Sequence, residues 1–195
     1  MTELRDLLKA DPIDMNALAE HLDALPGDER LLQVRSMSFK MEKRLYHAAQ
    51  GFKAISIDDI VPPSVGVMQP VRHDGKNTIP IFSYFAKVFM RPTEDGPELW
   101  GYNATNWLIT TFVGPGYFVA YNHSVPGEVL VDYLRLPEGG HPDWPAIIGN
   151  DKRLSRLVYY QTQDVLRGVS KHVSIGRATK KGKDMPAYFV LCRQD

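Results

Sequence analysis

The sequence predicts an α+β protein in which short N-terminal helices precede a curved, mostly antiparallel β-sheet or barrel-like meander of about seven strands. Hydrophobic residues recur at helical spacing within residues 1–52. From residue 81 onward, β-branched and aromatic residues dominate. The expected strands follow one another through short turns that contain Gly or Pro, which favours an antiparallel meander over a parallel sheet.

The length and composition are those of one globular protein with a substantial core. The chain has 195 residues, of which 44% are hydrophobic and 24% are charged. We expect a helical N-terminal segment over residues 1–52 and an antiparallel β-sheet domain over residues 53–195. The two are expected to form one compact unit.

The helical segment contains several residues that favour helix starts and ends. Thr2, Asp14 and Ser38 are candidate N-caps, Asp28-Glu29 suits the first turn of a helix, and Gly51 is typical of a helix end. Helices this short are unstable alone, so their apolar faces must pack on each other or on the sheet.

Residues 53–80 are interpreted as a transition, in which Ser56 caps one helical turn and residues 73–77 form a turn. A long apolar strand is expected over 81–90. Residues 107–113 resemble a strand, with a short helix after Asn106 as the alternative. The remaining expectations are strands at 117–121 and 129–136, a Pro- and Gly-rich loop at 137–150, an undecided segment at 151–160, and strands at 165–178 and 187–193.

Several functional classes are not expected from this sequence. A single cysteine, Cys192, excludes an internal disulfide. The N-terminus has no apolar segment typical of a signal peptide, and no apolar run reaches the roughly 18 residues of a membrane span. We therefore expect a cytoplasmic protein without a membrane partner.

The formal net charge is +0, so no overall field attracts nucleic acid or an anionic membrane. The charge is nevertheless uneven, because residues 151–195 carry ten basic and four acidic side chains, a net +6. Lys180, Lys181 and Lys183 fall within one expected turn without interleaved aromatic residues. This pattern is typical of a solvated hairpin, and we expect no nucleic-acid partner.

Motifs that would identify an enzyme or a cofactor are absent. The chain has no glycine-rich phosphate loop, no H-E-x-x-H and no G-x-S-x-G. Its six histidines do not fall at a close metal-ligand spacing, so no metal is predicted. The sequence does not indicate a particular cofactor.

Charged residues on apolar strand faces are the most informative candidates for a site. By the period of two, Asp132 shares a face with Leu130 and Leu134, and Lys87 lies between Phe85 and Phe89.

Arg167 and Arg177 likewise fall among apolar residues of the strand expected at 165–178. These groups have three interpretations: an internal salt bridge of Asp132 or Asp164 with Arg167 or Arg177, solvated strand ends, or the floor of a pocket that binds an anionic or polar ligand.

Aromatic and amide side chains gather at two turns and suit an apolar cleft with polar anchors. Together with the charged candidates they give the predicted ligand-binding set: Tyr102, Asn106, Trp107, Tyr121, Asp132, Arg167, His172 and Arg177.

The leading functional hypothesis is a module that binds a small apolar or anionic molecule in an aromatic-lined cavity of the curved sheet. An alternative is an enzyme that uses the same cavity, with His123 or His172 facing Asp132 or Asp164 as an acid–base pair. A third is a protein-interaction module, or a homo-oligomer, formed through the N-terminal helices. The sequence leaves open whether the protein is an enzyme.

Overall fold

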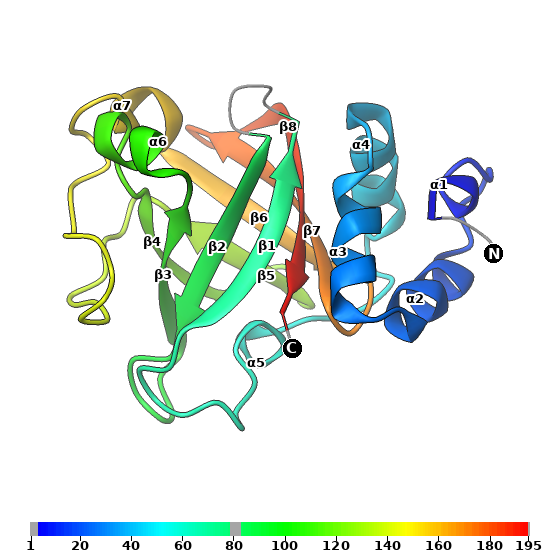
Figure 1. Cartoon of the computed structure of the whole chain (residues 1–195), viewed down its shortest axis with the longest axis horizontal. Coiled ribbons are helices and arrows are strands. Elements are labelled where there is room, and N and C mark those ends of the chain that lie inside the picture. The colour runs from blue at the N-terminus through cyan, green and yellow to red at the C-terminus, as the bar shows by residue number, and fades with distance from the viewer. Residues whose placement is uncertain (1–3, 79–82, 195) are drawn as a thin grey trace.

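The chain folds into a closed antiparallel β-barrel with helices on one side and at both ends (Figure 1). The computed structural model describes residues 4–78 and 83–194. The strands are β1 (Val71–Asn77), β2 (Tyr84–Met90), β3 (Glu98–Ala104), β4 (Tyr117–Asn122), β5 (Glu128–Asp132), β6 (Thr162–Gly168), β7 (Val173–Lys180) and β8 (Lys183–Arg193). Each strand pairs with its neighbour in sequence, and β1 pairs with β8 to close the barrel.

The helices are short, as the sequence predicts. They are α1 (Leu4–Leu7), α2 (Met15–Ala24), α3 (Gly27–Arg35), α4 (Phe39–Ala48), α5 (Ile57–Ile60), α6 (Trp107–Phe112) and α7 (Ser155–Val158). The α+β class with a barrel-like meander is therefore confirmed, and the described residues form eight strands instead of about seven.

The largest error in the predicted elements is at residues 73–77, which form part of β1 and not a turn. The segment His-Asp-Gly-Lys-Asn has the composition of a turn, but its backbone is paired with β2 on one side and β8 on the other. Gly75 is needed there for space, because a Cβ atom would lie 2.5 Å from the carbonyl oxygen of Val190. Pairing on both sides has overridden the local preference of this segment.

Other predicted segments also differ from the structure, among them the strand expected at 129–136, which ends at Asp132 as β5. Strand β3 was not predicted, and the single strand expected at 165–178 is the hairpin of β6 and β7. Residues 107–113 follow the helical alternative and form α6. The expected strand at 81–90 is described from Tyr84 onward as β2; residues 79–82 lie outside the described residues, as does the candidate cap Thr2.

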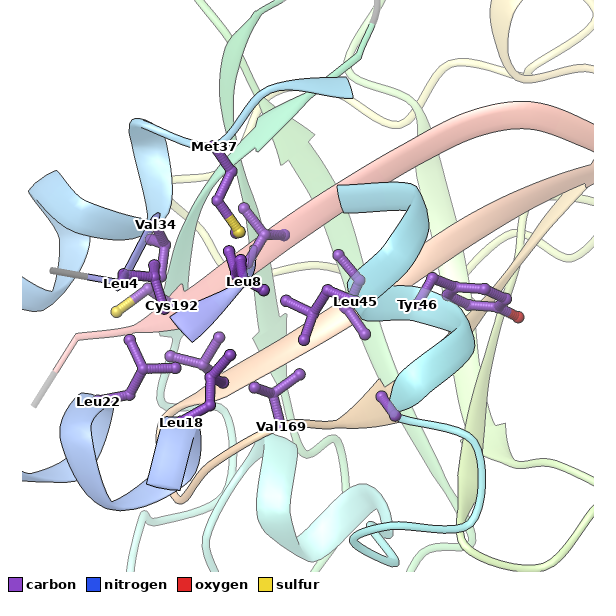
Figure 2. Close-up of a cluster of buried hydrophobic side chains, with 14 of the residues drawn as sticks. Leu4, Leu8, Leu18, Leu22, Val34, Met37, Leu45, Tyr46, Val169 and Cys192 are labelled. Atoms are coloured by element: carbon purple, nitrogen blue, oxygen red, sulfur yellow. The ribbon is translucent and has the colours of Figure 1, made fainter. Parts of the chain in front are cut away.

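The N-terminal helices cover the outer face of β7 and β8. Helix α3 lies against β1 and β8, and α4 lies against β7 and β8. Asp14 caps α2 and Ser38 caps α4 through side-chain hydrogen bonds, as predicted. Figure 2 shows buried side chains of these helices meeting Val169 and Cys192 of the barrel. The helices are stabilised by this shared core.

A second core fills the interior of the barrel. Its members alternate along the strands with outward-facing residues, and they include Phe85, Phe89, Phe118, Val131 and Leu191. Helix α5, which begins at a capping box formed by Ser56 and Asp59, adds Ile57 and Ile60 to this core.

Figure 1 shows α5 at one end of the barrel and α6 and α7 at the other. In the described part of the chain, no helix has the length and apolar character needed to cross a bilayer.

Glu42 is a buried carboxyl group in the core between α4 and the barrel. Neither of its carboxylate oxygens has a hydrogen-bond partner among the described residues. Burial raises the pKa of Glu42 from 4.5 to about 8, and the nearby Lys76 ammonium opposes this only in part. The side chain is therefore mostly neutral near pH 7.

We predict that Glu42 makes the fold less stable as the pH rises. The unfolded chain loses this proton near pH 4.5, whereas the folded chain keeps it until about pH 8. The folded state binds one more proton in this window, so the free energy of unfolding falls by up to ~1.4 kcal/mol per pH unit and levels off above it. Urea unfolding at about pH 5.5 and about pH 7.5 measures this change.

Glu42→Gln should remove most of the fall in stability, because an amide does not titrate. Glu20→Gln, at an exposed position on α2, is the matched control and should keep the wild-type dependence. Equal pH dependence of the wild-type and Glu42→Gln proteins would contradict the assignment.

Candidate functional site

A cavity of about 100 Å³ lies inside the barrel at the end occupied by α7. Its walls are mainly apolar and aromatic, and they include Phe85, Phe189, Val158, Ala178 and Met185. Its polar lining comes from residues on several strands and on the segment after α7: Asn77, Lys87, Asn103, Thr105, Tyr133, Tyr159, Thr162, Asp164 and Tyr188.

A buried ion pair forms part of the lining of this cavity. The Nζ atom of Lys87 lies 2.9 Å from Oδ2 of Asp164, and the two side chains are 2% and 7% exposed. Lys87 is on β2 and Asp164 is on β6, so the pair spans the barrel interior. Ions buried this deeply are stable only when they are paired and hydrogen-bonded.

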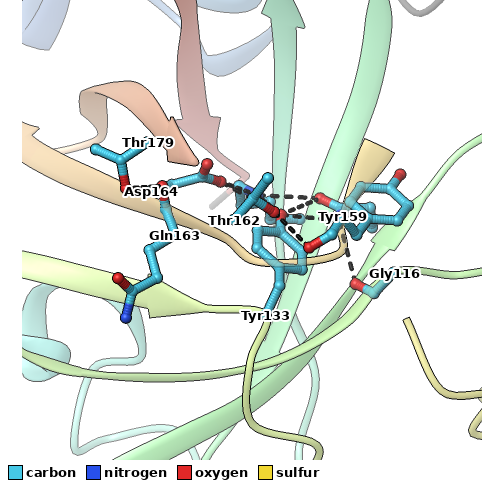
Figure 3. Close-up of polar contacts among 9 residues, drawn as sticks. Gly116, Tyr133, Tyr159, Thr162, Gln163, Asp164 and Thr179 are labelled. Carbon is cyan, nitrogen blue, oxygen red and sulfur yellow. Dashed lines mark hydrogen bonds and ion pairs between the residues drawn. The ribbon is translucent and has the colours of Figure 1, made fainter. Parts of the chain in front are cut away.

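Tyr133 and Asn103 complete the hydrogen bonding of the ion pair. Lys87 donates to Oδ1 of Asn103 at 3.0 Å and to the hydroxyl of Tyr133. The Tyr133 hydroxyl lies 3.3 Å from Oδ2 of Asp164, as a dashed line in Figure 3 shows, and it accepts a hydrogen bond from Nδ2 of Asn103 at 2.9 Å. Asn103 also donates to the carbonyl of Gly116. The four side chains form one fixed polar cluster.

Aromatic rings surround the ammonium group of Lys87. The rings of Phe85, Phe118, Tyr133 and Phe189 have centroids 5.0–5.7 Å from Nζ. Such contacts are favourable for a cation with little access to water.

Burial lowers the pKa of Lys87, and the Asp164 carboxylate opposes that change. Burial, reinforced by Asp164, also raises the pKa of Tyr133 well above its ordinary value, so its hydroxyl stays protonated.

Tyr159 is a further tyrosine in the lining of the cavity. Its ring stacks on that of Tyr133 with the centroids 5.2 Å apart and the planes at 19°. Burial and then the Asp164 charge raise its pKa, so it too remains a hydrogen-bond donor. Among the described residues its hydroxyl has no hydrogen-bond partner, and neither has Oδ1 of Asp164. Either group can bond to a ligand without breaking an existing contact.

The predicted acid Asp132 does not point into the barrel. Val131 and Tyr133 face the interior, so the neighbouring Asp132 faces outward, where it accepts a hydrogen bond from the Tyr121 hydroxyl at 3.1 Å. Tyr102 is also on the outer face and packs against Tyr117 and Trp144. The alternation predicted along β5 is therefore confirmed, but the face predicted to be the interior is the outer face.

Arg167 and Arg177 lie between the barrel and α4, and not inside the barrel. Arg167 is paired with Glu128 at 2.7 Å, and Arg177 with Asp184 at 2.6 Å. Both guanidinium groups lie over the ring of Tyr46, at 4.1 Å and 4.9 Å from its centroid. The predicted internal salt bridges of Asp132 or Asp164 with these arginines are therefore wrong, because Asp164 is paired with Lys87.

The remaining predicted residues are also not among the described residues that line the cavity. Asn106 precedes α6 and lines a surface depression near Arg35. Trp107 begins α6, and its side chain lies outside those that the structure describes. His172 is in the hairpin between β6 and β7, near Arg193. The structure brings none of the eight predicted residues into the described lining, and their role as ligand contacts stays a prediction.

Only part of the cavity could have been found from the sequence. Lys87 was visible as a charge between two phenylalanines of a strand. Asp164 was predicted to form an ion pair, but with an arginine instead of Lys87. Asn103 belongs to one of the two turns where aromatic and amide side chains gather in the sequence. No local pattern distinguishes Tyr133 or Tyr159 from the other tyrosines of the chain, because barrel closure brings them to the cavity.

The ion pair predicts a clear effect on stability. Lys87→Met leaves the Asp164 carboxylate buried without a counter-ion, so the free energy of unfolding should fall by about 3–5 kcal/mol in urea unfolding at neutral pH. The double variant Lys87→Met/Asp164→Leu removes both charges and should recover most of this loss.

Lys9→Met is the control, because it breaks an exposed ion pair with Asp6 and should change stability by less than about 1 kcal/mol. A Lys87→Met protein as stable as the wild type would show that the pair is not needed to keep Asp164 buried.

Comparison with known proteins identifies no relative of this chain. No family model, no curated protein and no solved structure matches it. Among the described side chains, no three His, Cys, Asp or Glu residues are grouped so that they could hold a metal ion.

Proposed function

We infer that the barrel binds a small neutral molecule, apolar except for one hydroxyl or amide group, in the cavity beside α7. The observation that carries this proposal is the combination of aromatic walls with a polar lining whose charges already balance. Ligand sites in proteins commonly have this arrangement of mostly apolar walls and a few fixed polar groups.

The balanced charge at Lys87 and Asp164 favours a neutral ligand. An anion would gain from Lys87 but would be repelled by Asp164, and a cation would meet the reverse situation. Either would lose its hydration without gaining a free counter-ion. Arg167 and Arg177, which the sequence suggested as an anion-binding fork, are paired with carboxylates outside the barrel.

The hydrogen bonds that remain available define the polar end of the ligand. The Tyr159 hydroxyl can donate to an oxygen of the ligand, and Oδ1 of Asp164 can accept from an O–H or N–H group. A hydroxyl or a primary amide supplies both an acceptor and a donor.

The size of the cavity limits the buried part of the ligand. At about 100 Å³ it is smaller than the roughly 150 Å³ apolar cavity that accepts benzene in an engineered protein. The buried part is therefore a short chain or at most one small ring.

The two alternative functions receive less support from the geometry. No histidine is part of the cavity lining in the described part of the chain. His123 instead lies 3.5 Å from Glu128. Among the described residues, the cavity therefore has no His–carboxylate pair that could act as acid and base. The apolar faces of the N-terminal helices are largely used against β7 and β8, which leaves little of them for a partner.

Four ligands of similar size test the preference for a neutral molecule. We expect butyramide and 1-butanol to shift NMR signals of residues around the cavity, and butyrate and butylamine to bind at least about ten-fold more weakly, because a charge without a partner is costly to bury. Butyrate binding as tightly as butyramide would overturn the neutral-ligand proposal.

Tyr159→Phe tests the hydrogen bond directly. Loss of one neutral hydrogen bond should weaken butyramide binding about five-fold, while stability should hardly change because the hydroxyl has no partner in the described chain. Tyr160→Phe, which alters the exposed neighbouring hydroxyl, should leave the affinity unchanged in the same titration. Equal affinities of the two variants would remove Tyr159 from the site.

A further inference from the structure

Large apolar side chains are exposed together at the α6–α7 end of the barrel. Phe112, Leu154, Leu157 and Tyr160 have exposed fractions of 62%, 51%, 73% and 38%. The backbone N–H of Leu154 donates to the carbonyl of Phe112 at 3.4 Å, which places the start of α7 beside the end of α6. Figure 1 shows the two helices side by side. We call these four side chains the apolar tip.

Basic residues surround the apolar tip. The segments 151–162 and 178–184 carry six basic residues and two acidic ones: Lys152, Arg153, Arg156, Lys180, Lys181 and Lys183 against Asp151 and Asp184. The hairpin between β7 and β8 is attached to α7, because Lys180 donates through Nζ to the carbonyl of Leu157 at 3.0 Å and the N–H of Lys181 donates to the carbonyl of Gln161 at 2.9 Å.

The cavity is lined from this same end. Val158 and Tyr159, which line it, lie between Leu157 and Tyr160 of the apolar tip, and Met185 and Ala187 line it just after the basic hairpin. Any partner that binds to the apolar tip would therefore lie next to the part of the cavity that α7 forms.

We propose that the apolar tip and its surrounding basic residues dock reversibly on an anionic lipid bilayer. Exposed apolar side chains enter the boundary between headgroups and acyl chains, and flanking Lys and Arg residues are attracted to anionic headgroups. The zero net charge of the chain does not oppose this, because headgroup attraction acts only over about a Debye length and depends on the local charge. The expectation of no membrane partner was based on the total charge of the chain and on membrane-spanning segments. It did not address a local surface such as the apolar tip.

A bilayer fits the tip better than the other partners that a basic surface can attract. Single-stranded nucleic acid is held by aromatic rings between basic residues, whereas two of the four tip residues are leucines, including the most exposed one. Docking on the bilayer does not require the ligand proposed above. It would, however, bring the cavity to the lipid phase, in which neutral apolar molecules dissolve.

Co-sedimentation of the full-length protein with vesicles tests the proposal. We expect binding to phosphatidylcholine vesicles that contain about one third phosphatidylserine, weaker binding as salt increases, and at least ten-fold weaker binding to pure phosphatidylcholine. Absence of binding to the anionic vesicles, or equal binding to both kinds, would overturn the proposal.

Two variants separate the apolar and electrostatic contributions. Arg156→Glu/Lys181→Glu should weaken binding to the anionic vesicles by at least about twenty-five-fold, at about five-fold for each basic residue removed. Leu157→Ser should weaken it by about ten-fold.

The matched controls lie away from the tip. Lys40→Glu/Lys43→Glu makes the same change in net charge on α4, and Leu32→Ser removes an exposed leucine from α3. Both controls should bind like the wild type. If Leu157→Ser binds like the wild type and single-stranded RNA competes with the vesicles, the surface is a nucleic-acid site and the lipid proposal is wrong.

Discussion

Pairing between β1 and β8 is the constraint on which the rest of this structure depends. It gives β1 and β8 their second neighbours, so none of the described strands lies at an open edge of the sheet. It also divides the side chains of each strand into an inner and an outer set. An eight-stranded barrel encloses a space that side chains can almost fill, which explains why the interior is mainly a core and retains a cavity of only about 100 Å³.

The division into two faces creates two separate cores. The inner core is closed at one end by α5, and the outer core is formed where α1–α4 cover β7 and β8. Arg167 and Arg177 belong to the outer region, where both stack on Tyr46 of α4 and are paired with carboxylates. Their charges help to position a helix on the barrel and do not contribute to the interior.

The barrel interior contains a polar cluster that is surrounded by apolar side chains. An ion pair buried at this depth adds little net stability compared with hydrophobic residues of similar volume. At Lys87 and Asp164, however, the charges hold Tyr133 and Asn103 in fixed positions and leave the adjacent Tyr159 hydroxyl available. The cluster therefore gives the cavity a defined polar side and a defined charge balance, from which the neutral character of the ligand was inferred.

The sequence by itself determined the features that depend on neighbouring residues: the caps at Asp14, Ser38 and Ser56, the helical segment, the antiparallel class, and Lys87 as a charge among apolar strand residues. The tertiary structure decided which face of each strand is inside. A period of two shows that alternate residues share a face, but it does not show which face becomes the interior. For this reason the sequence predicts Asp132 on the inner face. The turn predicted at residues 73–77 is wrong for a different reason, because pairing with β2 and β8 overrides the turn-like composition of this segment. The partner of Lys87 lies on a strand distant in sequence, and only barrel closure brings Asp164 to it.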